Sequence, residues 1–170
     1  MDLCVVDWGA ISSIAAALIA SGTALYISNK WSKQKGGEVI ATESKQVIKD
    51  ILELVKIINY FENGPKKKDE DLEAEFEKFV NGYDFVVINT AFIEDCLVDD
   101  DLKVNFDSFS VSSLKVKRII KENNKRPGDK ELARAVHEFN IEAIKLVNTL
   151  NPYSTFRKGC KFKLKKKSTS

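Results

Sequence analysis

The feature that most constrains this chain is an uncharged run of twenty residues near its N-terminus, from Trp8 to Ile27. As a helix, a run of this length covers about 30 Å, the thickness of the hydrocarbon core of a bilayer. Trp8 stands at one end, and Tyr26 and Trp31 stand at the other, where interfacial aromatic residues are expected. The run therefore predicts a transmembrane helix over residues 8–29.

Other interpretations of this run fit less well. A cleavable signal peptide needs a basic segment before the apolar run, whereas only Asp2 and Asp7 carry charge there. A lipoprotein signal places its cysteine after the apolar run, whereas Cys4 precedes it. The main rival is a helix buried in a soluble domain, and the length of the uncharged run favours a span over it.

Basic residues follow the run and do not precede it. Lys30, Lys33 and Lys35 come directly after it, and no Lys or Arg stands before it. The positive-inside rule then predicts a single-pass protein of the cell (inner) membrane. Residues 1–7 would be a short extracytoplasmic N-terminus, and residues 30–170 would lie in the cytoplasm.

Small and large residues fall on different faces of the predicted span. When the run is drawn as a helix, bulky residues are nearly absent from one face, which carries the small residues Gly9, Ser13, Ala16, Ala20, Thr23 and Ala24. Small residues let two helix backbones approach closely, and hydroxyl groups hydrogen-bond across such contacts. We therefore expect this face to pack against a second copy of the chain or another transmembrane protein. The plainer explanation is that alanine is common in membrane spans.

The rest of the chain predicts a compact all-α domain over residues 38–153. Before it, residues 30–37 form a basic juxtamembrane segment that ends in a Gly36-Gly37 hinge. Apolar residues then recur at helical spacing in four stretches separated by turn signals. The predicted helices span residues 38–61, 69–96, 108–123 and 130–150. Four amphipathic helices joined by short loops predict a small antiparallel bundle.

Residues 84–93 belong to the second predicted helix, but their pattern is ambiguous. Apolar side chains cover most faces of this stretch, so periodicity alone does not separate a helix from a strand. The helical neighbours favour a helix, and its composition would make it the most buried one.

No motif points to catalysis, to a metal or to a cofactor. His137 has no nucleophile or metal partner in the sequence, and the three cysteines are too scattered for a zinc site or a disulfide framework. The densest acid cluster matches no EF-hand spacing and is better explained as an exposed helix end and loop. It comprises Glu94, Asp95, Asp99, Asp100 and Asp101.

The last segment, residues 154–170, is a basic tail. Its basic residues are Arg157, Lys158, Lys161, Lys163, Lys165, Lys166 and Lys167. Anionic lipid would attract each such lysine by about 1 kcal/mol, and Phe162 and Leu164 would enter the bilayer surface. Nucleic acid is the other polyanion to consider, but the acidic remainder of the domain does not favour it. A disordered solubilising tail fits equally well.

Together these features predict a membrane-tethered, non-enzymatic interaction protein. It would associate through its transmembrane helix and present a helical domain in the cytoplasm. The alternative is a membrane-active effector, such as a small toxin or phage-defence component, whose oligomers perturb the bilayer. An enzyme that uses the acid cluster or His137 is the least favoured hypothesis.

Overall fold

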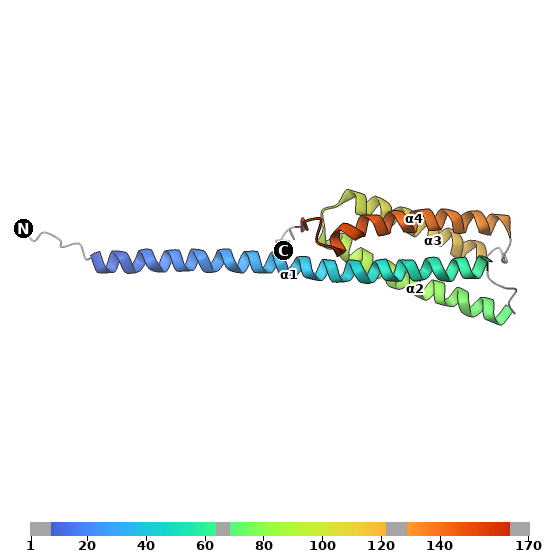
Figure 1. The fold of residues 1–170 in the computed structure, drawn as a ribbon, viewed down its shortest axis with the longest axis horizontal. Coiled ribbons are helices and arrows are strands. Elements are labelled where there is room, and N and C mark those ends of the chain that lie inside the picture. Colours follow the sequence, from blue (N-terminus) through green and yellow to red (C-terminus); the bar gives the residue numbers. More distant parts are fainter. Residues whose placement is uncertain (1–7, 64–68, 122–128, 164–170) are drawn as a thin grey trace, which may run out of the picture. The chain divides into compact units, whose positions relative to one another are not determined.

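The structure is a computed structural model that describes residues 8–63, 69–121 and 129–163, with only the backbone described for residues 8–17, 69 and 70. The described residues hold four helices: α1 (Trp8–Asn63), α2 (Asp69–Cys96), α3 (Asp100–Lys121) and α4 (Lys130–Ser154) (Figure 1). They form no strand, and their one β-type pairing is an isolated antiparallel bridge between Leu97 and Phe162. The all-α prediction is therefore confirmed.

The chain divides into two compact units, residues 1–38 and residues 39–170. The helical assignment of α1 runs through Gly36 and Gly37 without a break. The boundary between the units falls directly after these glycines, between Glu38 and Val39. A hinge at the two glycines stays a prediction.

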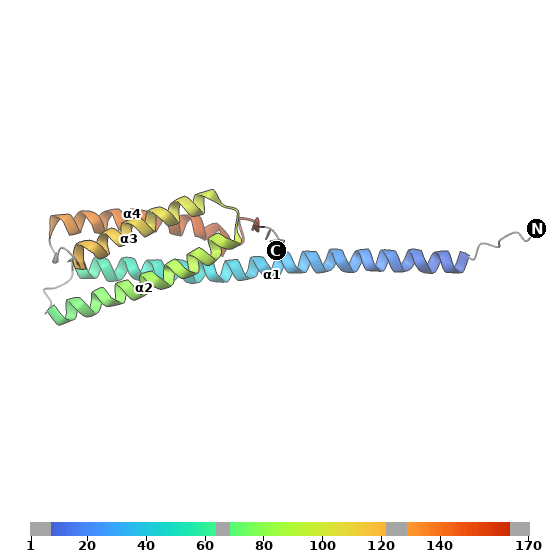
Figure 2. The ribbon, with the colours of Figure 1, turned by 180° about the vertical axis from the view of Figure 1, so that it is seen from behind.

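The second unit is a bundle of four antiparallel segments. The C-terminal part of α1 is followed by α2, α3 and α4, and each helix runs opposite to the one before it (Figures 1 and 2). Each helix turns an apolar face inward, as its 3.6-residue periodicity predicts. Three fully buried phenylalanines, Phe79, Phe109 and Phe139, meet at the centre from three different helices. The ring of Phe139 lies 5.5 Å from that of Phe79 and 5.6 Å from that of Phe109.

The start of α3 differs from the prediction. The helix begins at Asp100, well before the predicted start near Ser108. Its first turn is held by the Asp99 side chain, whose Oδ1 accepts hydrogen bonds from the backbone N–H groups of Asp101 (3.2 Å) and Leu102 (3.3 Å). The acids that follow suit the positive end of the helix dipole. Part of the predicted loop is therefore a capped helix start.

Helix α4 begins where predicted and ends later than predicted. Asp129 is the N-cap and accepts hydrogen bonds from the backbone N–H groups of Glu131 and Leu132. The helix continues through Pro152 to Ser154 instead of stopping at Leu150. Proline in the last turn removes one helical hydrogen bond. Burial of Tyr153, which is 3% exposed, compensates for that loss.

Residues 84–93 are helical, but α2 is not buried on all sides. Phe85 and Ile88 are 66% and 65% exposed, and Phe92 is 46% exposed. The apolar residues of α2 are therefore divided between the core and the solvent. The expectation that this is the most buried helix is wrong.

The predicted span lies in the N-terminal part of α1. Within the part of the chain that the structure describes, no helical stretch is both long enough and apolar enough to cross a membrane. The side chains of residues 8–17, half of the uncharged run, lie outside the described residues.

Gly82 sets the distance between α1 and α2, and this gives a first prediction. A Cβ atom added at Gly82 would lie 2.8 Å from Cδ2 of the buried Leu54. Overpacking of this kind costs about 1–3 kcal/mol, of which the better helix propensity of alanine offsets about 1 kcal/mol. Gly82→Ala should therefore lower the urea midpoint of unfolding.

The matched control for this prediction is Gly37→Ala. No atom lies within 4 Å of a Cβ built at Gly37. This change should leave the midpoint unchanged or raise it. Equal midpoints for the two variants, measured by circular dichroism, would contradict the close packing at Gly82.

Candidate functional site

The residues of the predicted helix–helix contact all lie on α1 in the first unit. Gly9, Ser13 and Ala16 are in helical backbone, and their side chains lie outside the described residues. The other three, Ala20, Thr23 and Ala24, are exposed. The Thr23 hydroxyl donates to the carbonyl oxygen of Ile19 (2.8 Å), so it is satisfied within its own helix. The contact itself stays a prediction.

The described part of the basic tail is folded against the bundle. Residues 155–163, here called the C-terminal strap, cross the junction between α2 and α3. The backbone N–H of Val98 donates to Lys161 O (2.8 Å), and that of Lys163 donates to Cys96 O (3.0 Å). The two bonds flank the bridge between Leu97 and Phe162. The tail is therefore anchored by its own backbone.

Two strap side chains add apolar contact to this anchorage. Leu97 and Phe162 form a non-hydrogen-bonded antiparallel pair. In such a pair the two side chains lie close together on the same side of the backbones. Leu97 is 2% exposed, and Phe162 and Cys160 are partly buried against the core cluster. Phe162, which we predicted to enter lipid, thus contacts protein in this structure. Leu164, the other predicted lipid contact, lies outside the described residues.

The lysines of the strap pair with the acid cluster at the α2–α3 junction. Lys158 Nζ lies 2.7 Å from Oδ2 of Asp99, and Lys163 Nζ lies 3.7 Å from Oε1 of Glu94. Arg157 and Lys161 are exposed. Residues 165–167, which carry the other predicted polyanion contacts, lie outside the described residues. The basic tail and the acid cluster, which we interpreted separately as solvent-exposed, therefore form ion pairs with each other.

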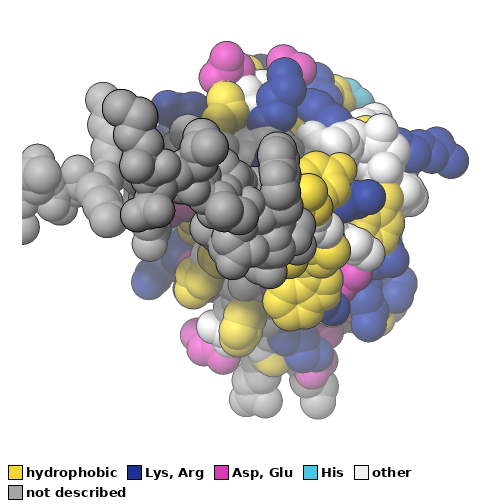
Figure 3. All heavy atoms as spheres, turned by 90° about the vertical axis from the view of Figure 1, so that its left-hand side faces the viewer, with side chains coloured by type: hydrophobic (Ala, Val, Ile, Leu, Met, Phe, Trp, Pro, Cys, Tyr) yellow, Lys and Arg dark blue, Asp and Glu magenta, His cyan; other side chains and the backbone are white. Residues whose placement is uncertain are grey.

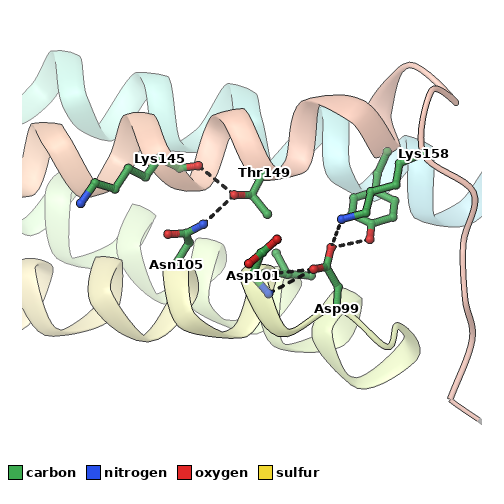
Figure 4. Close-up of polar contacts among 8 residues, drawn as sticks. Asp99, Asp101, Asn105, Lys145, Thr149 and Lys158 are labelled. Atoms are coloured by element: carbon green, nitrogen blue, oxygen red, sulfur yellow. Dashed lines mark hydrogen bonds and ion pairs between the residues drawn. The ribbon is translucent and has the colours of Figure 1, made fainter.

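Asp99 is the centre of this arrangement, and its side chain is only 5% exposed. Its Oδ2 accepts hydrogen bonds from the Tyr153 hydroxyl and from Lys158 Nζ, while its Oδ1 faces the start of α3 (Figure 4). The Lys158 ammonium group also lies 5.1 Å from the centre of the Tyr153 ring. One carboxylate thus joins the α2–α3 junction, the end of α4 and the strap; we call this set of three side chains the Asp99 latch.

The hydrogen bonds of the latch shift the pKa values of all three of its side chains. Burial alone would raise the pKa of Asp99, but hydrogen bonds from Lys158, Tyr153 and the Leu102 backbone together lower it below its ordinary value. Burial and the hydrogen bond to Asp99 raise the pKa of Tyr153 to about 12. The hydrogen bond to Asp99 raises the pKa of Lys158 despite its partial burial. The three shifts favour a charged Asp99, a charged Lys158 and a neutral Tyr153, which are the forms that make these hydrogen bonds.

Other candidate groups do not assemble into a site. His137 is exposed on α4. Cys96 and Cys160 are free thiols, and burial raises the pKa of Cys160, which makes its thiolate less accessible. Within the described ranges no three His, Cys, Asp or Glu side chains are grouped closely enough to hold a metal ion.

The surface of the bundle also has an open groove of about 370 Å³ between α1 and α2. Leu54, Ile57 and Gly82 contribute apolar lining, Phe85 lies beside them, and Asp50 and Glu53 are its charged lining residues. Nothing in the sequence analysis anticipated this groove. Elsewhere, hydrophobic side chains are exposed between basic and acidic ones on the face seen in Figure 3.

Comparison with known proteins yields no relative: no family model, curated protein or solved structure matches this chain at a significant level.

The latch predicts a pH dependence of stability. Tyr153→Phe removes a hydrogen bond to a charged group, which costs about 1.5–3 kcal/mol. Because the pKa of Tyr153 is raised in the folded protein, its contribution is complete below the unfolded pKa of about 10 and is lost as the pH rises towards 12. Urea unfolding should therefore show a difference between the two proteins that is constant from pH 7 to 9 and shrinks above pH 10.

The acid side of this prediction uses Asp99→Asn. The pKa of Asp99 is lowered on folding, so its contribution is present above about pH 4 and is lost on further acidification. This variant should lose stability at pH 7 and respond less to acid than the unmodified chain. Tyr26→Phe, at an exposed tyrosine, serves as the control and should change nothing. A pH-independent effect of Tyr153→Phe would refute the assigned hydrogen bond.

Proposed function

We propose that this chain is a membrane-tethered, non-enzymatic interaction protein. The N-terminal part of α1 lies in the bilayer, with residues 1–7 outside and the helical bundle on the cytoplasmic side. The anchor associates with a second copy or with another transmembrane helix through its face of small residues. The bundle is the part that meets a partner.

The observation that carries this proposal is the exposure of α1 over residues 18–35. Every residue from Leu18 to Lys35 is exposed. Six of these residues are large and hydrophobic, and each is between 58% and 70% exposed: Leu18, Ile19, Leu25, Tyr26, Ile27 and Trp31. Exposed apolar surface costs about 25 cal/mol per Å² in water, so exposure of this kind favours lipid or another helix around this part of α1.

The exposure argues against the main rival interpretation. A helix buried in a soluble domain turns its apolar residues towards a core, as α1 does from Ile40 onwards, where Val47, Ile51 and Leu54 are at most 1% exposed. Between Leu18 and Lys35, where the side chains of this part of the helix are described, no residue is buried. The change from a one-sided to an all-round pattern supports two different environments for the two parts of α1.

The orientation rests on the cationic side chains that follow the run. Lys35 forms an exposed ion pair with Glu38 (2.8 Å), and exposed pairs of this spacing contribute less than about 1 kcal/mol. Lys30, Lys33 and Lys35 are all exposed and accessible to headgroups. Their position favours a cytoplasmic location for this end of the predicted anchor.

Extraction of membranes tests the anchor. The chain should stay in the membrane fraction through a wash with sodium carbonate at high pH, because apolar burial does not depend on charge. The control is the second unit alone, residues 39–170, which should be recovered in the supernatant. Release of the complete chain by the wash would overturn the proposal.

Association through the small face is tested by enlarging one residue on it. Ala20→Leu places a branched side chain between two closely approaching backbones, and contacts of this kind are worth about 1–2 kcal/mol. Association should then weaken by up to about tenfold in a membrane two-hybrid or cross-linking assay. Ala16→Leu should behave alike.

The matched control is Leu18→Ala, which alters a large residue of the opposite face. It should change association very little. Equal effects of Leu18→Ala and Ala20→Leu would mean that the span is an anchor without a specific face. Leakage of dye from vesicles that carry the unmodified chain would instead favour the membrane-active effector.

A further inference from the structure

One face of α2 is apolar and has no cover within the described residues. Phe85, Ile88 and Phe92 follow one another at spacings of three and four, which places them on a single stripe of the helix. All three are exposed by 46% or more, although the rest of α2 buries Phe79, Val86 and Ile93 completely. Large side chains grouped on the outer face of a packed helix are typical of a contact surface.

The stripe borders the groove between α1 and α2. Phe85 and Gly82, which precedes it by one turn, both line the groove. Leu54 and Ile57 of α1 line the same space. A ridge of apolar side chains next to a hollow that is partly lined by apolar residues is a geometry that receives one face of an amphipathic helix.

Acidic residues flank this surface on both edges. On the α1 edge, the groove's charged lining residues are Asp50 and Glu53. On the far edge, Asp84 and Asp95 are exposed at positions that helical spacing places beside Ile88 and Phe92.

Two of the cations near these edges, Lys56 and Lys78, are held in ion pairs. Lys56 pairs with Glu53 at 3.4 Å, and both side chains are more than 60% exposed. Lys78 pairs with Glu75 at 3.3 Å. Exposed pairs are weak, so a partner's cations can replace the Lys56 contact.

We propose that the groove between α1 and α2, with the stripe of Phe85, Ile88 and Phe92, binds a basic amphipathic helix of a partner protein. An apolar side chain of that helix enters the hollow beside Gly82, and its Lys or Arg residues meet the acids on the two edges. A second copy of the same surface fits less well, because an α2–α2 contact would bring acidic edges together. This inference deepens the proposed function and rests on it only in treating the bundle as the part that meets a partner.

The test measures binding of a fluorescein-labelled synthetic helix of Leu and Lys residues to the complete chain in nanodiscs of uncharged lipid. Empty nanodiscs give the background. A peptide with Glu in place of every Lys should bind at least tenfold more weakly, because only the basic peptide complements the acidic edges. Equal binding of the two peptides would overturn the proposal.

Variants of the chain locate the site. Phe85→Ser should weaken binding of the basic peptide about tenfold. Its matched control is Val111→Ser, at a residue of α3 that is 68% exposed and lies away from the groove, and it should not change the affinity. Circular dichroism verifies that both variants keep the fold. Unchanged affinity of Phe85→Ser would overturn the proposal.

Reversing the charge of two edge residues tests whether the edges themselves attract the peptide, and not the overall charge of the chain. Asp50→Lys combined with Asp84→Lys should weaken binding of the basic peptide and strengthen binding of the Glu-containing peptide. Asp107→Lys, at an exposed acid of α3, should do neither. If Phe85→Ser abolishes self-association of the chain and leaves peptide binding intact, the surface belongs to a second copy and the proposal fails.

The failure of this inference is distinguishable from that of the proposed function. If a carbonate wash releases the chain, the anchor is wrong, and the same titration is run in buffer without nanodiscs. Peptide binding there would support the groove even so. Retention in the membrane with no peptide binding would leave the anchor supported and refute the groove.

Discussion

The carboxylate of Asp99 is the interaction on which one end of the bundle depends. One of its oxygens holds the first turn of α3, and the other accepts hydrogen bonds from Tyr153 near the end of α4 and from Lys158 of the strap. A charge with a side chain only 5% exposed is tolerated when such donors surround it. The same group therefore caps a helix, fixes the last turn of another and pins the tail. Removal of it would leave three segments without their common partner.

Different interactions hold the middle of the bundle and a polar contact outside its core. In the middle, Phe79, Phe109 and Phe139 pack edge to face or tilted, and their contribution comes from apolar burial. A polar contact of α1 with α4 lies outside this core, where Asn140 Nδ2 donates to Asn59 Oδ1 at 2.9 Å. Apolar burial sets how strongly the helices pack, whereas directional contacts of this kind help to fix which side chains meet.

Apolar periodicity of 3.6 residues predicted the helices. The exception is residues 84–93 of α2, where apolar residues cover most faces and the helical neighbours favoured a helix. The Asp129 cap was also predictable, since a single acid directly before a periodic stretch has one local role. Asp99 was not, because its main partner, Tyr153, is 54 positions away and no local pattern links them. The exposed apolar face of α2 was missed for a related reason: composition reports how apolar Phe85 and Ile88 are, but not which side of the helix the bundle covers.

The strap has a thermodynamic consequence for any anion that the tail meets. Lys158 has one ammonium group, which is held by Asp99, and an external anion that captures it leaves a nearly buried carboxylate without its cation. Closure of the latch therefore competes with binding of an external anion to Lys158. By thermodynamic linkage the effect is reciprocal: the latch and the anion each weaken the other by the same factor. Lys163, held by Glu94, is subject to the same competition more weakly, since 3.7 Å separates the two charged groups. The tail consequently offers less free charge to a polyanion than its seven basic residues suggest.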